Sequence, residues 1–211
     1  MILVHHRRNT VSELSETPPA WGVEIDIRNH GKELLVTHDP FHEEAVTIET
    51  WLDGYDHAFL IANVKEEGLE PRLHALLRER GIDDYFILDE SFPFIRKYAL
   101  QGFSKFAVRG SEYEAPETAL RLSAALRGDG YQVDWIWADS FSGQPLDLAD
   151  ATALRAAGYR ICAVSPELHH VGDPASWERR IADFRASLAQ PGMAPSLPDM
   201  VCTKRPDLWE D

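Results

Sequence analysis

The stretch that decides the fold of this chain is residues 22–27, which read GVEIDI. It has the apolar, β-branched character of a buried strand, and side chains alternate between two faces along a strand. Glu24 and Asp26 therefore point to one face, while the apolar residues around them point to the other. Two carboxylates on one face of a strand repel each other and lose hydration, so the pattern indicates a cation between them.

Histidine and arginine lie on both sides of this strand in the sequence. The first apolar segment, 2–5, runs into His6 and Arg7, and an extended segment at 33–37 leads into His38 and Asp39. Imidazoles transfer protons near neutral pH, and a carboxylate pair can hold a metal that activates an oxygen. The combination indicates metal-assisted chemistry on an anionic substrate.

The composition limits the class of protein. The 211 residues carry a formal net charge of −14, which argues against a general nucleic-acid binder, because phosphate backbones require clustered Lys and Arg. A small phosphate-bearing substrate remains compatible with this charge. The length predicts a single domain over 1–211. No apolar run of about 18 residues, signal-peptide pattern or basic amphipathic helix is found, so we expect a cytoplasmic protein without stable membrane association. The oligomeric state is left open.

Short apolar segments alternate with helical patterns along the whole chain. Strands are predicted at 2–5, 22–27, 57–64, 85–88, 104–108, 133–137, 159–164 and 199–203. Helices are predicted at 70–80, 93–101, 116–127, 146–157 and 175–189, most of them followed by a glycine such as Gly128. Such alternation is typical of parallel βαβ units, and eight strands is the number that closes a (β/α)8 TIM barrel. A doubly wound sheet is the second choice, because no G-x-G-x-x-G follows the first strand.

The chain is short for such a barrel, which typically has about 250 residues. We therefore expect a compact barrel in which some helices are trimmed. The link 7–21 contains two prolines and leaves little room for a full helix.

Polar side chains follow most of the predicted strands, where the active sites of TIM barrels lie. Asn63 and Lys65 follow the third of these strands, and Arg109, Glu112 and Glu114 follow the fifth. We expect these side chains to meet in one mouth of the barrel.

The pattern resembles the glycerophosphodiester phosphodiesterase family of the phospholipase-C-like barrels. The elements that carry the resemblance are His6-Arg7 with Asn9-Thr10, Glu24-x-Asp26, His38-Asp39, Asn63-Val64-Lys65 and residues 203–206. It runs from residue 4 to about 208, although the specific motifs lie mainly in the first third. The second half is similar to a divergent, largely bacterial branch.

The resemblance implies an enzyme of lipid metabolism, a phosphoric diester hydrolase that releases glycerol 3-phosphate and an alcohol from a glycerophosphodiester. It implies that Glu24 and Asp26 bind a divalent metal ion, Mg²⁺ or Ca²⁺. It further implies that His6 and His38 are the paired acid and base, here with His6 as base, although the sequence leaves the direction open. Arg7 and Lys65 are implied to contact the phosphate of a small phosphodiester substrate.

The main departure from the family pattern concerns the metal site. Asn63 stands where the family usually has a third acidic ligand, and an amide oxygen can bind Mg²⁺ or Ca²⁺ but brings no charge. We expect either Asn63 or Glu112 to complete the metal site.

Alternatives stay open at this point. The barrel could be a non-catalytic, metal-dependent binder of a phosphorylated polyol or sugar, or a lyase-like phosphodiesterase that stops at a cyclic phosphate. Lys65 could instead pair with Glu66 or Glu67 on the surface. The charged groups after the fifth strand could form an ion-pair network that closes the barrel mouth.

Overall fold

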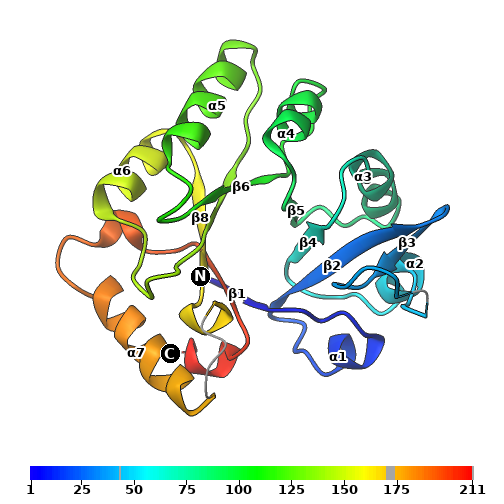
Figure 1. Cartoon of the computed structure of the whole chain (residues 1–211), viewed down its shortest axis with the longest axis horizontal. Coiled ribbons are helices and arrows are strands. Elements are labelled where there is room, and N and C mark those ends of the chain that lie inside the picture. Colours follow the sequence, from blue (N-terminus) through cyan, green and yellow to red (C-terminus); the bar gives the residue numbers. More distant parts are fainter. Residues whose placement is uncertain (43, 170–173, 211) are drawn as a thin grey trace.

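The computed structural model describes residues 1–42, 44–169 and 174–210. Within these ranges, parallel strands form a nearly closed barrel with helices between them (Figure 1). The strands are β1 (Ile2–His5), β2 (Gly22–His30), β4 (Leu60–Val64), β5 (Tyr85–Leu88), β6 (Ala107–Gly110), β7 (Trp135–Ala138), β8 (Arg160–Val164) and β9 (Met200–Thr203). The predicted (β/α)8 TIM barrel is confirmed.

The strands follow the order β5-β4-β2-β1-β9-β8-β7-β6. The ladders along this path are continuous; β2 and β4, for example, pair over five positions from Val23–Leu60 to Ile27–Val64. Between β5 and β6 the barrel closes through one isolated bridge, Ile87–Phe106. This seam is the weakest pairing of the barrel wall.

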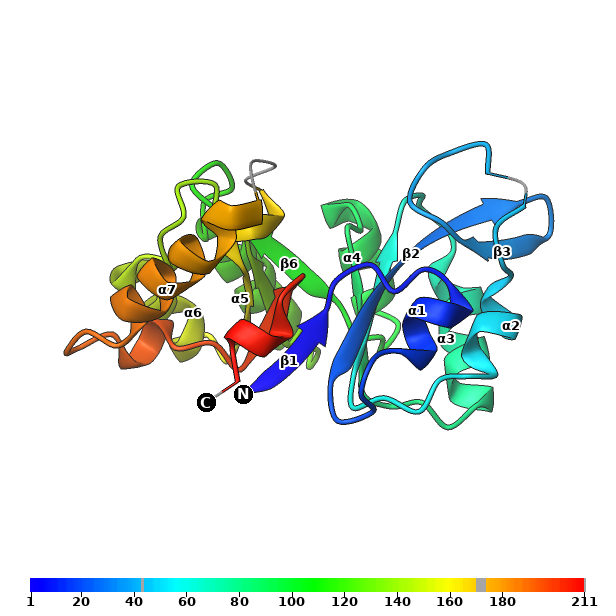
Figure 2. The same cartoon turned by 90° about the horizontal axis from the view of Figure 1, so that it is seen from below.

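A ninth strand, β3 (Glu33–Val36), pairs antiparallel with the second half of β2. Figure 2 shows that β2 and β3 together extend beyond the barrel on the side of α1 and α2. The extended segment predicted at 33–37 is this strand. It returns the chain from the end of β2 to Ile27 in its middle, and so determines where the following residues, 37–39, lie.

The helices lie outside the barrel. They are α1 (Val11–Ser15), α2 (Ile48–Leu52), α3 (Glu70–Glu79), α4 (Phe92–Ala99), α5 (Glu117–Gly128), α6 (Leu148–Ala156) and α7 (Trp177–Leu188), with 3₁₀ turns η1 (Pro166–Leu168), η2 (Pro174–Ser176), η3 (Ala194–Ser196) and η4 (Pro206–Leu208). The trimmed helices expected from the chain length are α1 and α2, with five residues each.

The glycine predicted to follow the helix at 116–127 is instead part of that helix. Gly128 is the last residue of α5, and the left-handed backbone conformation that ends the helix falls on Gly130, at φ +83°. The positive φ favours glycine at that position because a Cβ atom would be strained there.

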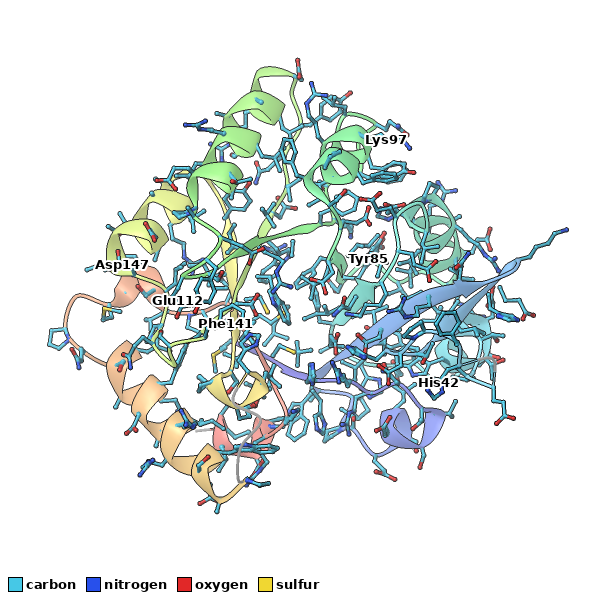
Figure 3. The ribbon with its side chains drawn as sticks, viewed as in Figure 1. His42, Tyr85, Lys97, Glu112, Phe141 and Asp147 are labelled. Carbon is cyan, nitrogen blue, oxygen red and sulfur yellow. The ribbon has the colours of Figure 1, made fainter. Side chains whose placement is uncertain are left out.

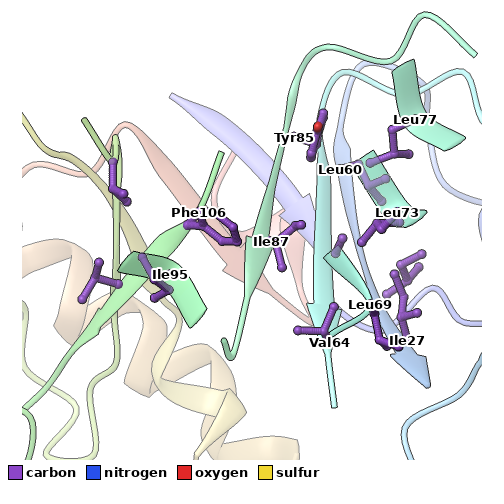
Figure 4. Close-up of a cluster of buried hydrophobic side chains, with 14 of the residues drawn as sticks. Ile27, Leu60, Val64, Leu69, Leu73, Leu77, Tyr85, Ile87, Ile95 and Phe106 are labelled. Atoms are coloured by element: carbon purple, nitrogen blue, oxygen red, sulfur yellow. The ribbon is translucent and has the colours of Figure 1, made fainter. Parts of the chain in front are cut away.

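Two apolar layers hold the barrel together. Side chains between the sheet and the helices form the larger one, in which Ile27 and Val64 of the sheet pack with Leu69 and Leu73 (Figure 4). The barrel interior is filled by the opposite faces of the strands, with Phe86, Trp135 and Trp137 as the largest side chains. Glu24 pairs in register with Ile61 of the interior layer, so the carboxylate face of β2 points into the barrel.

Among the described residues, no helix has the length and apolar character needed to cross a membrane.

Candidate active site at the C-terminal mouth of the barrel

The first part of the site joins β1, β2 and β4. Glu24 is buried, and its Oε2 accepts a hydrogen bond of 2.8 Å from the backbone N–H of Arg7 and lies 3.8 Å from His6 Nε2. Its other oxygen, Oε1, accepts a 3.0 Å hydrogen bond from the side-chain amide of Asn63. The structure thus brings His6, Glu24 and Asn63 together, as expected from the sequence.

Asp26 is fully buried beside this group. Its Oδ2 accepts a 2.9 Å hydrogen bond from the Asn9 amide and lies 3.6 Å from Arg7 Nε. The Asn9 side chain also accepts a hydrogen bond from the backbone N–H of Asp26, so the two residues are locked together. The first loop, after β1, is therefore held to β2 through its polar side chains.

Lys65 places its ammonium among three oxygen atoms. Its Nζ lies 2.7 Å from Asn63 Oδ1, 3.0 Å from Asp26 Oδ1 and 3.3 Å from Asp89 Oδ2. The surface pairing with Glu66 considered above is not formed; Glu66 lies 3.7 Å from Arg28 instead.

The contacts continue around the mouth to the strands of the second half. Arg109 Nη1 lies 2.5 Å from Asp89 Oδ1, its Nη2 binds Asp139, and its Nε lies 3.3 Å from Glu114. Asp139 in turn lies 2.6 Å from His169 Nε2. Of the alternatives above, the ion-pair network is formed by Arg109 and Glu114.

The last two strands complete the circle. Glu167, in the turn after β8, is fully buried and accepts hydrogen bonds of 2.6 Å from Thr203 Oγ1 and 2.9 Å from the backbone N–H of Lys204. The backbone N–H of His6 donates to the carbonyl of Thr203. Polar contacts therefore follow the strand order around the barrel mouth.

Two backbone positions in this mouth have a left-handed conformation that non-glycine residues rarely adopt. They are Arg7 at φ +52° and Asp89 at φ +66°. Such strain persists where surrounding contacts over-determine it and is frequent at functional sites. At Arg7 this conformation accompanies the hydrogen bond from its N–H to Glu24.

Burial controls the charge states at the mouth. It lowers the pKa of His6 to about 2, with further contributions from the positive charges of Arg7, Lys204, Arg8 and Lys65. It raises the pKa of Glu24, and the adjacent Asp26 charge raises it further. His6 is therefore a neutral imidazole at physiological pH, the form that can accept a proton.

The fold is similar to that of two solved structures. The chain is similar to a protein of Agrobacterium tumefaciens provisionally assigned as a glycerophosphoryl diester phosphodiesterase, with a TM-score of 0.66 and 12% identity over 99% of this chain and 95% of that one. It is also similar to a glycerophosphoryl diester phosphodiesterase of Parabacteroides distasonis, with a TM-score of 0.63 and 16% identity over 98% and 84%.

The likeness is one of fold. It confirms at that level the resemblance drawn from the sequence motifs, over nearly the whole chain. No family model matches the sequence. No curated protein matches it either. The low identities agree with a divergent branch of these phosphodiesterases.

His38 lies on the β3 side of the mouth. The backbone N–H of Thr37 donates to the carbonyl of Asp26, which brings the following residue close to the carboxylate strand. The His38 side chain is partly exposed, and its Nδ1 lies 2.8 Å from Asp39 Oδ1. Among the described residues, no hydrogen bond or ion pair joins His38 to His6, so their pairing stays a prediction.

Glu112 lies apart from the carboxylate strand. Its carboxylate accepts hydrogen bonds from the backbone N–H groups of Phe141 at 3.1 Å and Ser142 at 2.9 Å, in the loop after β7. Figure 3 shows Glu112 and Phe141 together, with His42 on the opposite side of the molecule. Glu112 orders this loop, and its role as a metal ligand stays a prediction that none of its contacts supports.

The residues expected to bind a divalent ion do not form a fitting set of donors. Asn63 turns its amide nitrogen toward Glu24 and its oxygen toward Lys65, so the oxygen that a metal needs is already engaged. Within the described ranges, no group of three or more His, Cys, Asp or Glu side chains has the arrangement of a metal site. The cations within reach of Asp26 are the Lys65 ammonium at 3.0 Å and the Arg7 guanidinium at 3.6 Å.

Sequence reasoning assigned no role to Asn9, Asp139 or Glu167, whose contacts build the mouth. Their common signal is their place just after a strand or at its end. That signal is weak because every strand must end in a polar loop, and contacts between distant strands are needed to sort such residues.

Proposed function

We propose that this chain hydrolyses a small phosphodiester at the C-terminal mouth of its barrel, and that the substrate is a glycerophosphodiester, cleaved to glycerol 3-phosphate and an alcohol. The observation that carries the proposal is the convergence of His6, Arg7, Glu24, Asp26 and Lys65 at the ends of β1, β2 and β4. These residue types stand in one mouth of a fold shared with two glycerophosphoryl diester phosphodiesterases.

Two cations supply the charge that a phosphodiester requires. The Arg7 side chain is 46% exposed, so its guanidinium can turn its remaining N–H groups toward solvent and a phosphate oxygen. Lys65 adds a compact point charge below it, with 15% of its side chain exposed. Positive groups held in a buried site stabilise the charge that builds up on the non-bridging oxygens in the transition state.

Two histidines supply the proton transfers. We assign His6 as the base that deprotonates the attacking hydroxyl or water, because its Nε2 lies 3.8 Å from Glu24 Oε2, a carboxylate that can stabilise the imidazolium as it forms. We assign His38 as the acid that protonates the leaving alkoxide, with Asp39 orienting its ring. With a glycerol-bearing substrate, a neighbouring hydroxyl is a natural nucleophile, and attack by it gives a cyclic phosphate first.

Charge effects also link the loop that carries His38 to the loop that follows β1. The hydrogen bond from His38 lowers the pKa of Asp39, and the nearby charges of His38, His42 and Arg7 lower it further. The charge of Arg7, which follows β1, is therefore felt at the loop that carries His38. Because Glu24, Asp26 and Asn63 do not present the donors of a divalent site, no step of the proposal passes through a metal.

The test is turnover of a panel of glycerophosphodiesters and one aryl phosphodiester, each with Mg²⁺, Mn²⁺ or Ca²⁺ and with EDTA, followed by ³¹P NMR. A phosphomonoester product supports hydrolysis, and a cyclic phosphate that accumulates identifies the lyase-like alternative. If folded protein binds these compounds without converting any of them, the hydrolase proposal is refuted in favour of a binding protein.

A further inference from the structure

The environment of the Lys65 ammonium is that of a bound cation. Three oxygen atoms from three different strand ends surround its Nζ at 2.7, 3.0 and 3.3 Å, and two of them belong to carboxylates. The side chain is 15% exposed, so much of this contact is shielded from water. Charge-assisted contacts of this kind are strong where solvent screening is weak.

Asn63 makes this arrangement possible. An acidic side chain at this position would lie against Glu24 and add a third negative charge to the Glu24–Asp26 pair, which only an added cation could offset. The amide instead donates to Glu24 at 3.0 Å and accepts from Lys65 at 2.7 Å. Asn63 therefore adds no negative charge to the cluster, and it holds the Lys65 ammonium beside the cluster through a hydrogen bond.

The remaining oxygens of the carboxylate pair also have partners. Glu24 Oε2 accepts from the Arg7 backbone, and Asp26 Oδ2 accepts from Asn9 and lies near the Arg7 guanidinium. Asp26 Oδ1 accepts no hydrogen bond from the described residues, and its contact is the ion pair with the Lys65 ammonium at 3.0 Å. Mg²⁺ is commonly held by one or two carboxylates and several waters. A divalent ion at Asp26 Oδ1 would have to displace the Lys65 ammonium, which lies 3.0 Å from this oxygen.

We propose that Lys65 is the resident cation of this site and that its ammonium takes the place of a divalent metal ion. The inference rests on the proposed function for what the cation does: it neutralises Asp26 in the resting protein and meets a phosphate oxygen when substrate binds. The family resemblance instead implies that Glu24 and Asp26 bind a divalent metal ion.

The decisive experiment measures metal binding without substrate. Titration calorimetry and metal-induced shifts in Tm with Mg²⁺, Mn²⁺ and Ca²⁺ are compared for the wild type, Asn63→Asp and a matched control, Gln101→Glu. Asn63→Asp has nearly the same shape as the wild type but replaces the N–H that faces Glu24 by an oxygen. Gln101→Glu makes the same amide-to-acid change at an exposed residue after α4, outside the barrel mouth.

The expected result is no saturable binding of a divalent ion by the wild type or the control, and at least tenfold tighter binding by Asn63→Asp. Turnover of the wild type is expected to be unchanged by EDTA. One saturable Mg²⁺, Mn²⁺ or Ca²⁺ per wild-type chain, lost in Asp26→Asn, would overturn the inference. The wild-type measurement decides the question even if Asn63→Asp does not fold. A protein that turns over no phosphodiester would refute the proposed function, while the binding measurements would still decide which cation the site holds.

Discussion

The two sides of the barrel mouth use similar charges in different ways. On the side of β1, β2 and β4, buried carboxylates meet a histidine, two amides, a lysine and a half-exposed arginine. On the side of β5, β6 and β7, Arg109 alone is clamped by three carboxylates. The first side holds cations that can change partners when a phosphate arrives. On the second side, Arg109 is already held by three carboxylates, which is typical of a structural network.

This comparison predicts that changes on the first side affect turnover and changes on the second side affect stability. The largest effect is expected for His6→Ala and His38→Ala. Each removes one proton-transfer group, and such groups contribute about 10²–10⁴-fold to rate. We expect kcat to fall by at least 10²-fold in each variant, with little change in Tm, measured by steady-state assays beside thermal unfolding. Turnover near that of the wild type in either variant would refute the role of that histidine.

On the second side, Arg109→Met is expected to destabilise the fold more than to slow the reaction. It leaves Asp89 and Asp139 without their shared cation, and removing one partner of a buried ion pair typically costs 3–5 kcal/mol. Because Arg109 is one-third exposed, we expect a loss of about 3 kcal/mol in the free energy of unfolding. Urea denaturation measures it, with Arg121→Met on the exposed face of α5 as control. A loss equal to that of the control would show that the network does not stabilise the mouth.

The seam between β5 and β6 should be sensitive to acid. His74 of α3 is buried there, with its ring stacked on Phe103 at 4.5 Å and its Nδ1 close to the Tyr85 hydroxyl. Burial lowers the pKa of His74 to about 4 from 6.5, and the Lys105 charge lowers it further. The unfolded chain therefore takes up a proton at higher pH than the folded one, and stability is lost as the pH falls from about 6.5 toward 4.

From the difference between the two pKa values of His74, we expect the free energy of unfolding to fall by about 2 kcal/mol between pH 7 and pH 5. Urea titrations at the two pH values should show a smaller difference for His74→Gln than for the wild type. His30→Gln, at an exposed histidine, is the control and should keep the wild-type difference. Equal pH dependence in all three proteins would mean that His74 is not charged on unfolding in this range.

The smallest effect is expected at the loop that connects the site to the trimmed helix α1. Thr10 caps this helix: its Oγ1 accepts from the backbone N–H of Glu13, and the Glu13 carboxylate accepts from the backbone N–H of Thr10. Loss of such a cap costs about 1 kcal/mol. We expect Thr10→Ala to lower the free energy of unfolding by this amount, whereas Thr118→Ala, inside α5, should be neutral. A neutral result at both positions would show that α1 is held by its packing alone.

The barrel could be predicted from the sequence because its signals are local. Each strand and each longer helix is marked by its own apolar period, and each predicted segment overlaps an observed one. The ends differ by up to three residues; the strand predicted at 57–64, for example, begins at Leu60. Alternation along β2 also predicted that Glu24 and Asp26 share the inner face. The weak closure at Ile87–Phe106 had no such signal, because it depends on how the whole wall curves.

The sequence by itself determined the parallel barrel and the cluster of acids, histidines and cations at its mouth, since parallel strands bring their carboxyl ends to one edge. Only the tertiary structure decided which of these groups are partners. Asn63 could have offered its oxygen to a metal, and Lys65 could have faced solvent. Their contacts with Glu24, Asp26 and Asp89 depend on distances of a few ångströms between residues far apart in the chain, and electrostatic interactions change steeply with such distances and with burial.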